Sequence, residues 1–275
     1  MKRFGLAVAM ALPALMTAQE RIAVPLTDPA RPATVRVELV NGSVSVKAYN
    51  GKEVIVEAKT QDEETRRGKQ RESAPEGLKR IPIGGNSLEI SEENNEVRIE
   101  SGAPMRSVDL EVQVPMRSTL KLEVVNGGDI KVEGVTGDIE AENVNGNVIL
   151  TNISGSAVAH ALNGRLVAVF TQVAPQKAMS FSSLNGNIDV TLPPSVKANV
   201  KVKTDNGDLY SDFDIALKAG GQPATEAGRD GKGKYKVKID RTVYGAINGG
   251  GPEFQFSNFN GNIYIRKAGS VANPR

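Results

Sequence analysis

A nine-residue repeat in the middle of the 275-residue chain constrains the fold more than any other feature of its sequence. Five glycines, Gly128, Gly137, Gly146, Gly155 and Gly164, follow one another at intervals of nine residues. Positions three and five of every unit are apolar, whereas position two is always polar. Because residues two apart lie on the same face of a strand, this pattern predicts one inward-facing strand in each unit.

The eighth position is apolar as well, and it is occupied by Val135, Val144, Ile153 and Leu162. We expect this residue to point into the same core after a bend of the chain. A segment of nine residues cannot bury its own apolar face, but copies stacked about 4.8 Å apart form one continuous core. The repeat therefore predicts an all-β fold of the β-solenoid type.

Asn-Gly pairs recur every 18 to 22 residues in the same region. Asn and Gly tolerate positive φ angles, so each pair predicts a tight turn. Two units per coil give this spacing, with Asn-Gly at one corner and Thr136-Gly137 or Ser154-Gly155 at the other. A β-sandwich is the alternative, although it does not need a nine-residue register. The predicted structural turns are Asn126, Gly127, Asn145, Gly146, Asn163, Gly164, Asn185, Gly186, Asn206, Gly207, Asn248, Gly249, Asn260 and Gly261.

Polar residues around these turns suggest two kinds of arrangement. The Asn side chains can stack as a ladder, with their amides bonded to the backbone of neighbouring turns. The polar second column raises a calcium hypothesis, although calcium-binding rolls carry two glycines and an aspartate in one turn, which no unit here does. A calcium-stabilised β-roll remains an alternative. Its candidate ligands are Asp129, Asp138, Asn147, Asn187, Asp189 and Asp208.

Catalytic chemistry has little support in the sequence. His160 is the sole histidine and occupies a position that should face solvent, and no triad partner stands at a recognisable spacing. We assign no catalytic, cofactor-binding or metal residue. A carbohydrate-active β-helix enzyme is an alternative function, but the chain has no Trp and 4% aromatic residues. Phe254 and Phe256 share one strand face and are expected to cap an open end of the core.

The N-terminus has the pattern of a secretory signal peptide over residues 1–18, with Lys2 and Arg3 before an apolar run at 4–15. This run is too short to span a membrane, so we expect no transmembrane anchor after cleavage. Cleavage removes two of the 34 basic residues and none of the 32 acidic ones, leaving a formally neutral chain. Neutrality provides no electrostatic case for nucleic acid binding.

The remaining chain is expected to form a single domain. We predict a linker at 19–32, one β-strand repeat domain at 33–267 and a tail at 268–275. Two inserts, near 60–86 and 218–233, interrupt the domain, because the first is densely charged without periodicity and the second is rich in Gly.

Two segments, 181–209 and 247–265, resemble the signature segments of the bacterial putative-adhesin β-strand repeat family, a domain of unknown function. They carry Asn-Gly before a polar-apolar-x-apolar run, then Leu192-Pro193 before the next alternating strand, and a late Asn-Gly-Gly-Gly-Pro. The resemblance implies an exported, solenoid-like β protein. We therefore expect a non-enzymatic structural or interaction module, adhesin-like, in the periplasm or at the cell surface. Its partner is expected to be an envelope protein or a surface polymer, and it needs no cofactor.

Overall fold

The computed structural model describes residues 20–60, 88–101, 107–217, 224–229, 235–240 and 242–269. These residues confirm the all-β prediction, because every regular element in them is a strand. In these ranges no segment forms a helix that is long and apolar enough to cross a membrane. The expected signal peptide, nearly all of the insert near 60–86 and most of the tail lie outside the described residues.

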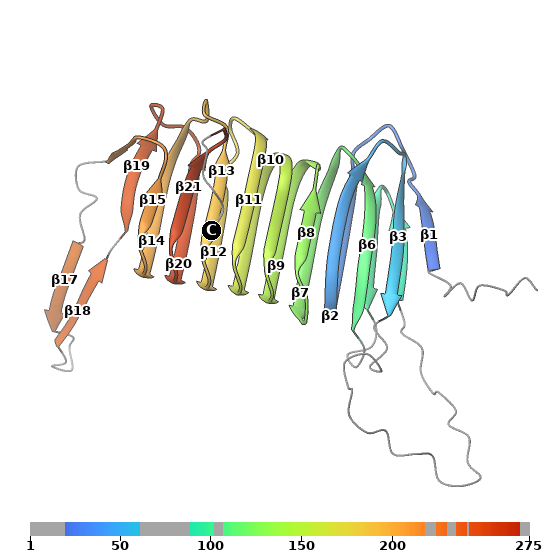
Figure 1. The fold of residues 1–275 in the computed structure, drawn as a ribbon, viewed down its shortest axis with the longest axis horizontal. Helices are drawn as coiled ribbons and strands as arrows, with labels where there is room; N and C mark the ends of the chain where they lie inside the picture. The colour runs from blue at the N-terminus through green and yellow to red at the C-terminus, as the bar shows by residue number, and fades with distance from the viewer. Residues whose placement is uncertain are drawn as a thin grey trace, which may run out of the picture.

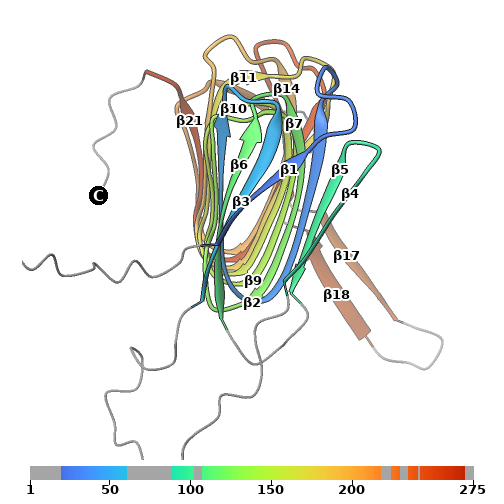
Figure 2. The ribbon, with the colours of Figure 1, turned by 90° about the vertical axis from the view of Figure 1, so that its right-hand side faces the viewer.

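Nineteen strands form one hydrogen-bonded network, a stack of coils in which an Asn-Gly corner joins two strands (Figures 1 and 2). Each coil contributes to two opposite layers, which we call face A and face B. Along the stack, face A consists of β4 (Leu88–Glu93), β5 (Glu96–Ser101), residues 33–41 of β2 (Ala33–Tyr49), β7 (Ser118–Asn126), β9 (Thr136–Asn145), residues 154–163 of β10 (Val148–Asn163), β12 (Met179–Asn185), β20 (Glu253–Asn260), β14 (Ala198–Asn206), β19 (Val243–Ile247) and β16 (Ile215–Leu217).

Face B contains the second strand of each coil. In order along the stack it consists of β1 (Glu20–Pro25), β3 (Glu53–Thr60), β6 (Val108–Pro115), residues 42–49 of β2, β8 (Ile130–Glu133), residues 148–153 of β10, β11 (Leu166–Val173), β13 (Ile188–Leu192), β21 (Ile263–Lys267) and β15 (Leu209–Ser211). A separate antiparallel hairpin, β17 (Ala224–Arg229) with β18 (Tyr235–Asp240), overlaps the second expected insert and lies beside the stack (Figure 1).

Parallel pairing at a nearly constant offset builds the middle of the stack. On face A, β7 pairs with β9, β9 with β10, and β10 with β12, each partner 18 to 22 residues further along the chain. Face B follows the same rule from β8 through β10 and β11 to β13. This solenoid-like pairing agrees with the spacing of the Asn-Gly pairs and differs from the antiparallel sheets of a β-sandwich.

The order of the coils in space departs from their order in the chain. The coil of β20 and β21 lies between the coil of β12 and β13 and the coil of β14 and β15. Phe254 and Phe256 are therefore fully buried in the interior of the stack, with 0% exposure, and do not cap an open end as we expected. Phe256 stacks on Phe181 with ring centroids 5.4 Å apart. The prediction was wrong because a position late in the chain does not specify which coils flank it.

Antiparallel strands close both ends of the stack. At one end β1 pairs with β3 and β3 with β6, and at the other end β19 pairs with β14 and β16. Because β1 lies within residues 19–32 and Val24 and Leu26 are buried, this segment is part of the folded domain and not a linker. Edge strands as short as β15 and β16 expose little unpaired backbone to other chains.

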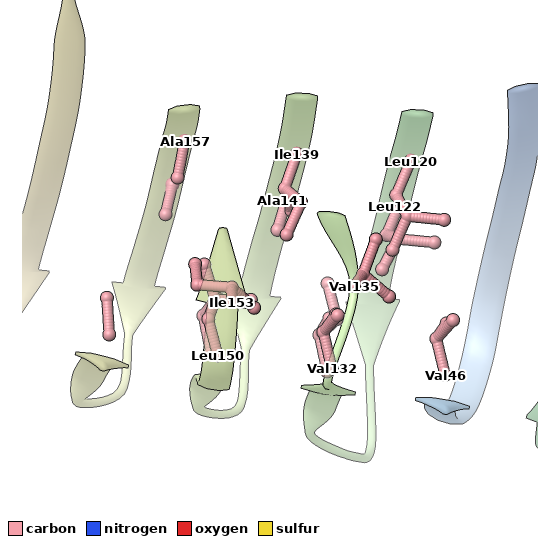
Figure 3. Close-up of a cluster of buried hydrophobic side chains, with 14 of the residues drawn as sticks. Val46, Leu120, Leu122, Val132, Val135, Ile139, Ala141, Leu150, Ile153 and Ala157 are labelled. Carbon is pink, nitrogen blue, oxygen red and sulfur yellow. The ribbon is translucent and has the colours of Figure 1, made fainter. Parts of the chain in front are cut away.

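The hydrophobic core runs along the stack between the two faces (Figure 3). Positions three and five of each nine-residue unit are buried as predicted, from Ile130 and Val132 to Leu166 and Ala168. These side chains form two columns on each face, and the apolar groups of one coil pack against those of the next.

We predicted that the eighth residue of every unit points into the core, and this is wrong in alternate units. Val135 and Ile153 are buried, but Val144 and Leu162 are half-buried on the outside of face A. The residue before Ile153 explains the difference, because Asn152 has a left-handed φ of 53° that reverses the in-out alternation. Gly134, with φ of 74°, does the same before Val135. At the Asn-Gly corners the alternation continues, so the residue before Val144 or Leu162 points inward.

The corner glycines are in very close contact with the preceding coil. A Cβ atom added at Gly164 would lie 2.1 Å from the carbonyl oxygen of Gly146, and one at Gly186 would lie 2.2 Å from the carbonyl oxygen of Gly164. Neighbouring strands are about 4.8 Å apart, so the corners have no room for a side chain. Glycine is required there by contact between coils.

Replacement of Gly164 with Val should lower the free energy of unfolding by at least about 3 kcal/mol, the upper end of ordinary single substitutions. The added side chain meets backbone, which can yield only by separating two coils. Arg165→Val is the matched control, because Arg165 is the next residue and is exposed. Chemical denaturation of the full chain measures both, and equal stability of the two variants would contradict the close stacking of the corners.

Candidate interaction surface

The Asn side chains of the corners form a ladder along one edge of the stack. Asn126, Asn145, Asn163, Asn185, Asn260 and Asn206 lie in register on consecutive strands. Their amides are joined side chain to side chain, with N–O distances of 2.8 to 3.1 Å. We expected the amides to bond to the backbone of neighbouring turns. Among these six residues Asn145 does so, because its amide also donates to the carbonyl oxygen of Val125. Because each of these amide–amide hydrogen bonds joins two neighbouring coils, the ladder holds the coils together.

Asn248 and Gly249 form a turn of another kind. Asn248 has a left-handed φ of 48°, and its amide donates to the carbonyl oxygens of Pro194 and Val196 at 3.0 and 2.7 Å. This pair follows β19 and fixes the loop before β14, so it is not a corner of the coils.

A second polar row lies inside the corners and was missed by sequence reasoning. Asn143, Ser183 and Asn258 are buried and point inward two residues before a corner Asn. Asn143 donates to the carbonyl of Gly128 at 2.9 Å, and Asn258 to that of Gly186 at 2.8 Å. These bonds satisfy corner carbonyls that the close stacking removes from solvent. The signal was weak because some of the other coils place an apolar residue, such as Val124 or Ala161, at the same position.

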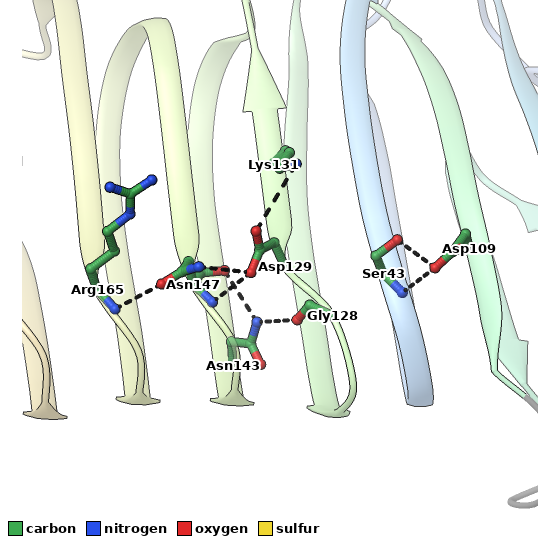
Figure 4. Close-up of polar contacts among 8 residues, drawn as sticks. All are labelled: Ser43, Asp109, Gly128, Asp129, Lys131, Asn143, Asn147 and Arg165. Atoms are coloured by element: carbon green, nitrogen blue, oxygen red, sulfur yellow. Dashed lines mark hydrogen bonds and ion pairs between the residues drawn. The ribbon is translucent and has the colours of Figure 1, made fainter. Parts of the chain in front are cut away.

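The polar column considered for calcium forms hydrogen bonds between coils (Figure 4). The carboxylate of Asp129 accepts from the backbone N–H and from the amide of Asn147, both at 2.9 Å. Asn147 in turn accepts from the backbone N–H of Arg165 at 3.0 Å. Further along, Asn187 accepts from the backbone N–H of Asn262. In the part of the chain that the structure describes, no group of three or more His, Cys, Asp or Glu side chains could hold a metal ion.

The other calcium candidates have protein partners of their own. Asp189 pairs with Arg266 at 2.7 Å, and Asp208 lies 3.4 Å from the hydroxyl of Tyr210. Asp138 pairs with Lys177. The six candidates are therefore distributed along the stack and do not converge on one point.

His160 lies on the outside of face A, as its position in the repeat predicted, and is half-buried. Its Nδ1 lies 2.6 Å from the hydroxyl oxygen of Ser182, and Glu142 is the register neighbour on its other side. Glu142, His160 and Ser182 are separated by 18 and 22 residues, which are the spacings of the repeat, so the repeat could have predicted that the three lie side by side. A catalytic relay requires His to bond the carboxylate as well. The contacts of His160 among the described residues do not include that bond.

An unbroken row of apolar side chains lies beside the Asn ladder on the outside of face A. It is formed by the residue before Asn at six neighbouring corners. Its members are Val40, Val125, Val144, Leu162, Leu184 and Phe259. Val40, Leu184 and Phe259 are 38%, 39% and 46% exposed, and the other three are half-buried. We call this feature the apolar row. The sequence signal was an apolar residue before the Asn of these six corners, but the nine-residue register assigned two of these residues to the core.

A row of carboxylates lies next to the apolar row. Glu100, Glu38, Glu123 and Glu142 are in register on four neighbouring strands of face A. We call them the Glu row. Arg36 donates to Glu38 at 2.5 Å, and this hydrogen bond, with the charge of Glu38, raises the pKa of Arg36. The Glu row is a strip of like charges about one strand spacing apart. A parallel strip of cations, Arg98, Arg36 and Lys121, lies two residues before it on three of the same strands.

The ionisation of Asp138 should make stability depend on pH in the acid range. The hydrogen bonds from Lys177, at 2.6 Å, and from Ser156 lower the pKa of Asp138. A lowered native pKa means that the charged form stabilises the fold above the ordinary pKa, and this contribution is lost as the pH falls through the native value. Both partners are about half exposed, so the contribution should be below about 1 kcal/mol.

Asp138→Asn should therefore be less stable than wild type at pH 7, and the difference should shrink as the pH falls below about 4. Thermal unfolding at several pH values measures it. Asp214→Asn, at an exposed position, is the control and should show no such trend. A difference that stays constant from pH 7 to pH 3 would rule out the ionised pair as its cause.

Comparisons with known proteins identify the family. The model of the Toastrack DUF4097 family matches residues 17–248. No curated protein matches the chain. Among solved structures, a putative cell adhesion protein from Clostridium sporogenes is similar with 10% sequence identity and a TM-score of 0.44, covering 91% of this chain and 100% of that chain. A putative adhesin from Bacteroides fragilis has 9% identity and a TM-score of 0.29, covering 92% and 98%. The family match spans most of the chain and confirms the resemblance found in the sequence, so this protein belongs to the Toastrack DUF4097 family, a domain of unknown function.

Proposed function

We propose that the protein is an exported, non-enzymatic interaction module that binds a partner protein of the cell envelope through the outside of face A. The observation that carries this proposal is the apolar row, which crosses six neighbouring strands from Val40 to Phe259. Single exposed apolar residues are common on protein surfaces, but a contiguous set of them is typical of a binding surface. A protein fits this row better than a surface polymer, because the row excludes water best against other apolar side chains.

The Glu row defines the chemistry of the partner more closely. Glu100, Glu123 and Glu142 extend beside one half of the apolar row. A surface that carries Lys or Arg next to apolar side chains complements this strip of carboxylates, because opposite charges in contact select the orientation of binding.

The regularity of face A supports binding over catalysis. Its side chains repeat from coil to coil along the stack, so an extended partner can make the same contact several times. Catalysis requires different groups that converge on one reacting atom. Within the described ranges, no observation favours the carbohydrate-active enzyme or the calcium-stabilised roll over this assignment.

Export and envelope location depend on the sequence of the N-terminal segment. Residues 1–18 should be removed during secretion, so that the mature chain begins at Gln19. Fractionation of cells that produce the full chain, followed by N-terminal sequencing of the purified protein, measures both location and cleavage. Recovery of a chain that retains residues 1–18 in the cytoplasmic fraction would contradict this part of the proposal.

The double variant Leu162→Ser/Leu184→Ser should lose the partner, because it breaks the apolar row at its centre. Val167→Ser/Val169→Ser is the matched control, since these half-buried side chains point outward from β11 on face B. Wild type and both variants are immobilised after circular dichroism has shown that they are folded. Proteins captured from an envelope extract are then quantified by mass spectrometry.

At least one protein should be captured by wild type and by the face B control, and at least about tenfold less by the face A variant, a difference of about 1.4 kcal/mol. Equal capture by all three proteins would show that face A is not the binding surface. Loss of capture by both variants would contradict the assignment as well, because the two substitutions lie on opposite faces.

A further inference from the structure

A small hollow lies at the corner opposite the Asn ladder, where β2 and β6 end. Its volume is about 210 Å³. The loop before β2, the turn after β2 and the connection from β6 to β7 surround it. The residues that matter for its chemistry are Pro29, Arg31, Pro32, Tyr49, Pro115 and Arg117. We call it the arginine hollow.

The lining of the arginine hollow is positively charged. Arg31 and Arg117 both line it, and none of its lining residues is acidic. Elsewhere in the stack, Arg36, Arg98 and Arg266 each pair with a carboxylate at 2.5 to 2.9 Å. The guanidinium groups of Arg31 and Arg117 form no ion pair with any residue in the ranges that the structure describes. The hollow therefore concentrates two positive charges that the described part of the fold leaves uncompensated.

A network of hydrogen bonds holds the loop that carries Arg31. The backbone N–H of Arg31 donates to the carbonyl oxygen of Asp28 at 3.1 Å. The backbone N–H of Asp28 donates to the side-chain oxygen of Asn95, and the side-chain amide of Asn95 donates back to the carbonyl oxygen of Asp28, both at 2.6 Å. Glu92 accepts from the backbone N–H and the hydroxyl of Thr27. The hairpin of β4 and β5 thus fixes this loop against the stack.

The backbone of Arg117 is held as well. The buried hydroxyl of Ser118 donates to the carbonyl of Pro115 at 2.7 Å, and Arg117 forms a β-bridge with Thr136. Tyr49, whose hydroxyl donates to the carbonyl of Glu53 at 2.8 Å, supplies a fixed ring to the wall. Both arginines therefore project from backbone that is ordered before any ligand arrives, which reduces the entropy lost on binding.

We propose that the arginine hollow binds a phosphate monoester carried on a small polar body such as a sugar. Two guanidinium groups match the charge of about −1.5 to −2 on a phosphate monoester at neutral pH, whereas a carboxylate balances only one of them. Guanidinium groups also bond oxyanions in a two-pronged geometry that fits phosphate. The hollow is smaller than the roughly 300 to 1,000 Å³ of a pocket for a drug-sized ligand. It therefore suits the charged end of a ligand whose remainder extends into solvent.

Isothermal titration calorimetry with glucose 1-phosphate tests this site, with inorganic phosphate and glucuronate as comparison ligands. Glucose 1-phosphate and inorganic phosphate should both bind the wild-type protein, and glucuronate should bind most weakly, because it carries a single negative charge. Arg31→Gln and Arg117→Gln should each weaken the binding of glucose 1-phosphate at least about tenfold, because each removes a charged donor. Arg165→Gln is the matched control, since Arg165 is an exposed arginine at the corner before β11, outside the hollow.

Selective loss in the two hollow variants, with normal binding in Arg165→Gln, supports the site. Equal binding by all four proteins would overturn it, because the anion would then be held by general surface charge. Failure of wild type to bind glucose 1-phosphate would overturn it too, and tighter binding of glucuronate would overturn the phosphate assignment. The result does not depend on the binding role of face A, because no residue of the apolar row lines the hollow.

Discussion

Contact between the corner glycines is the constraint on which the rest of this structure depends. At Gly146, Gly164 and Gly186, the position of a side chain is already occupied by the backbone of the preceding coil. The coils can therefore reach β-sheet spacing at the corners only where a side chain is absent. Once they do, the Asn beside each glycine meets its equivalent in the next coil, and the amide ladder follows from the same geometry.

In-register stacking also determines the character of the outer surface. When equivalent positions are placed one strand spacing apart, a preference for one residue type at that position becomes a continuous row. The apolar row and the Glu row on face A both arise in this way. One row presents apolar side chains and the other presents carboxylates, and both extend in the direction in which the coils repeat. Such a surface is suited to an extended contact with a partner.

Much of the fold could be predicted from the sequence where pairing partners are close in the chain. The glycine register and the Asn-Gly spacing specified the parallel pairing from β7 to β13, because each coil there stacks on the preceding one. The ends could not be predicted in the same way. The coil that carries Phe256 is placed against Phe181 by burial of large aromatic rings between segments that are distant in the sequence. No local pattern records that choice.

The candidate sites show the same division. Val144 and Leu162 were assigned to the core because a strict nine-residue period does not distinguish the two corners of a coil. The distinction depends on backbone conformation, notably the left-handed Asn152. The arginine hollow was not visible at all, because Arg31 and Arg117 come together only after β2 has paired beside β6 and β7.

The sequence by itself determined the repeat, the inward columns, the turn positions and the all-β class, because these follow from local periodicity and from the recurrence of Gly and Asn at fixed intervals. Only the tertiary structure decided which coils are neighbours, which apolar residues remain outside and which unpaired charges share a hollow. Those outcomes depend on contacts between residues far apart in the chain, where burial and close packing select one arrangement among several that the local pattern allows.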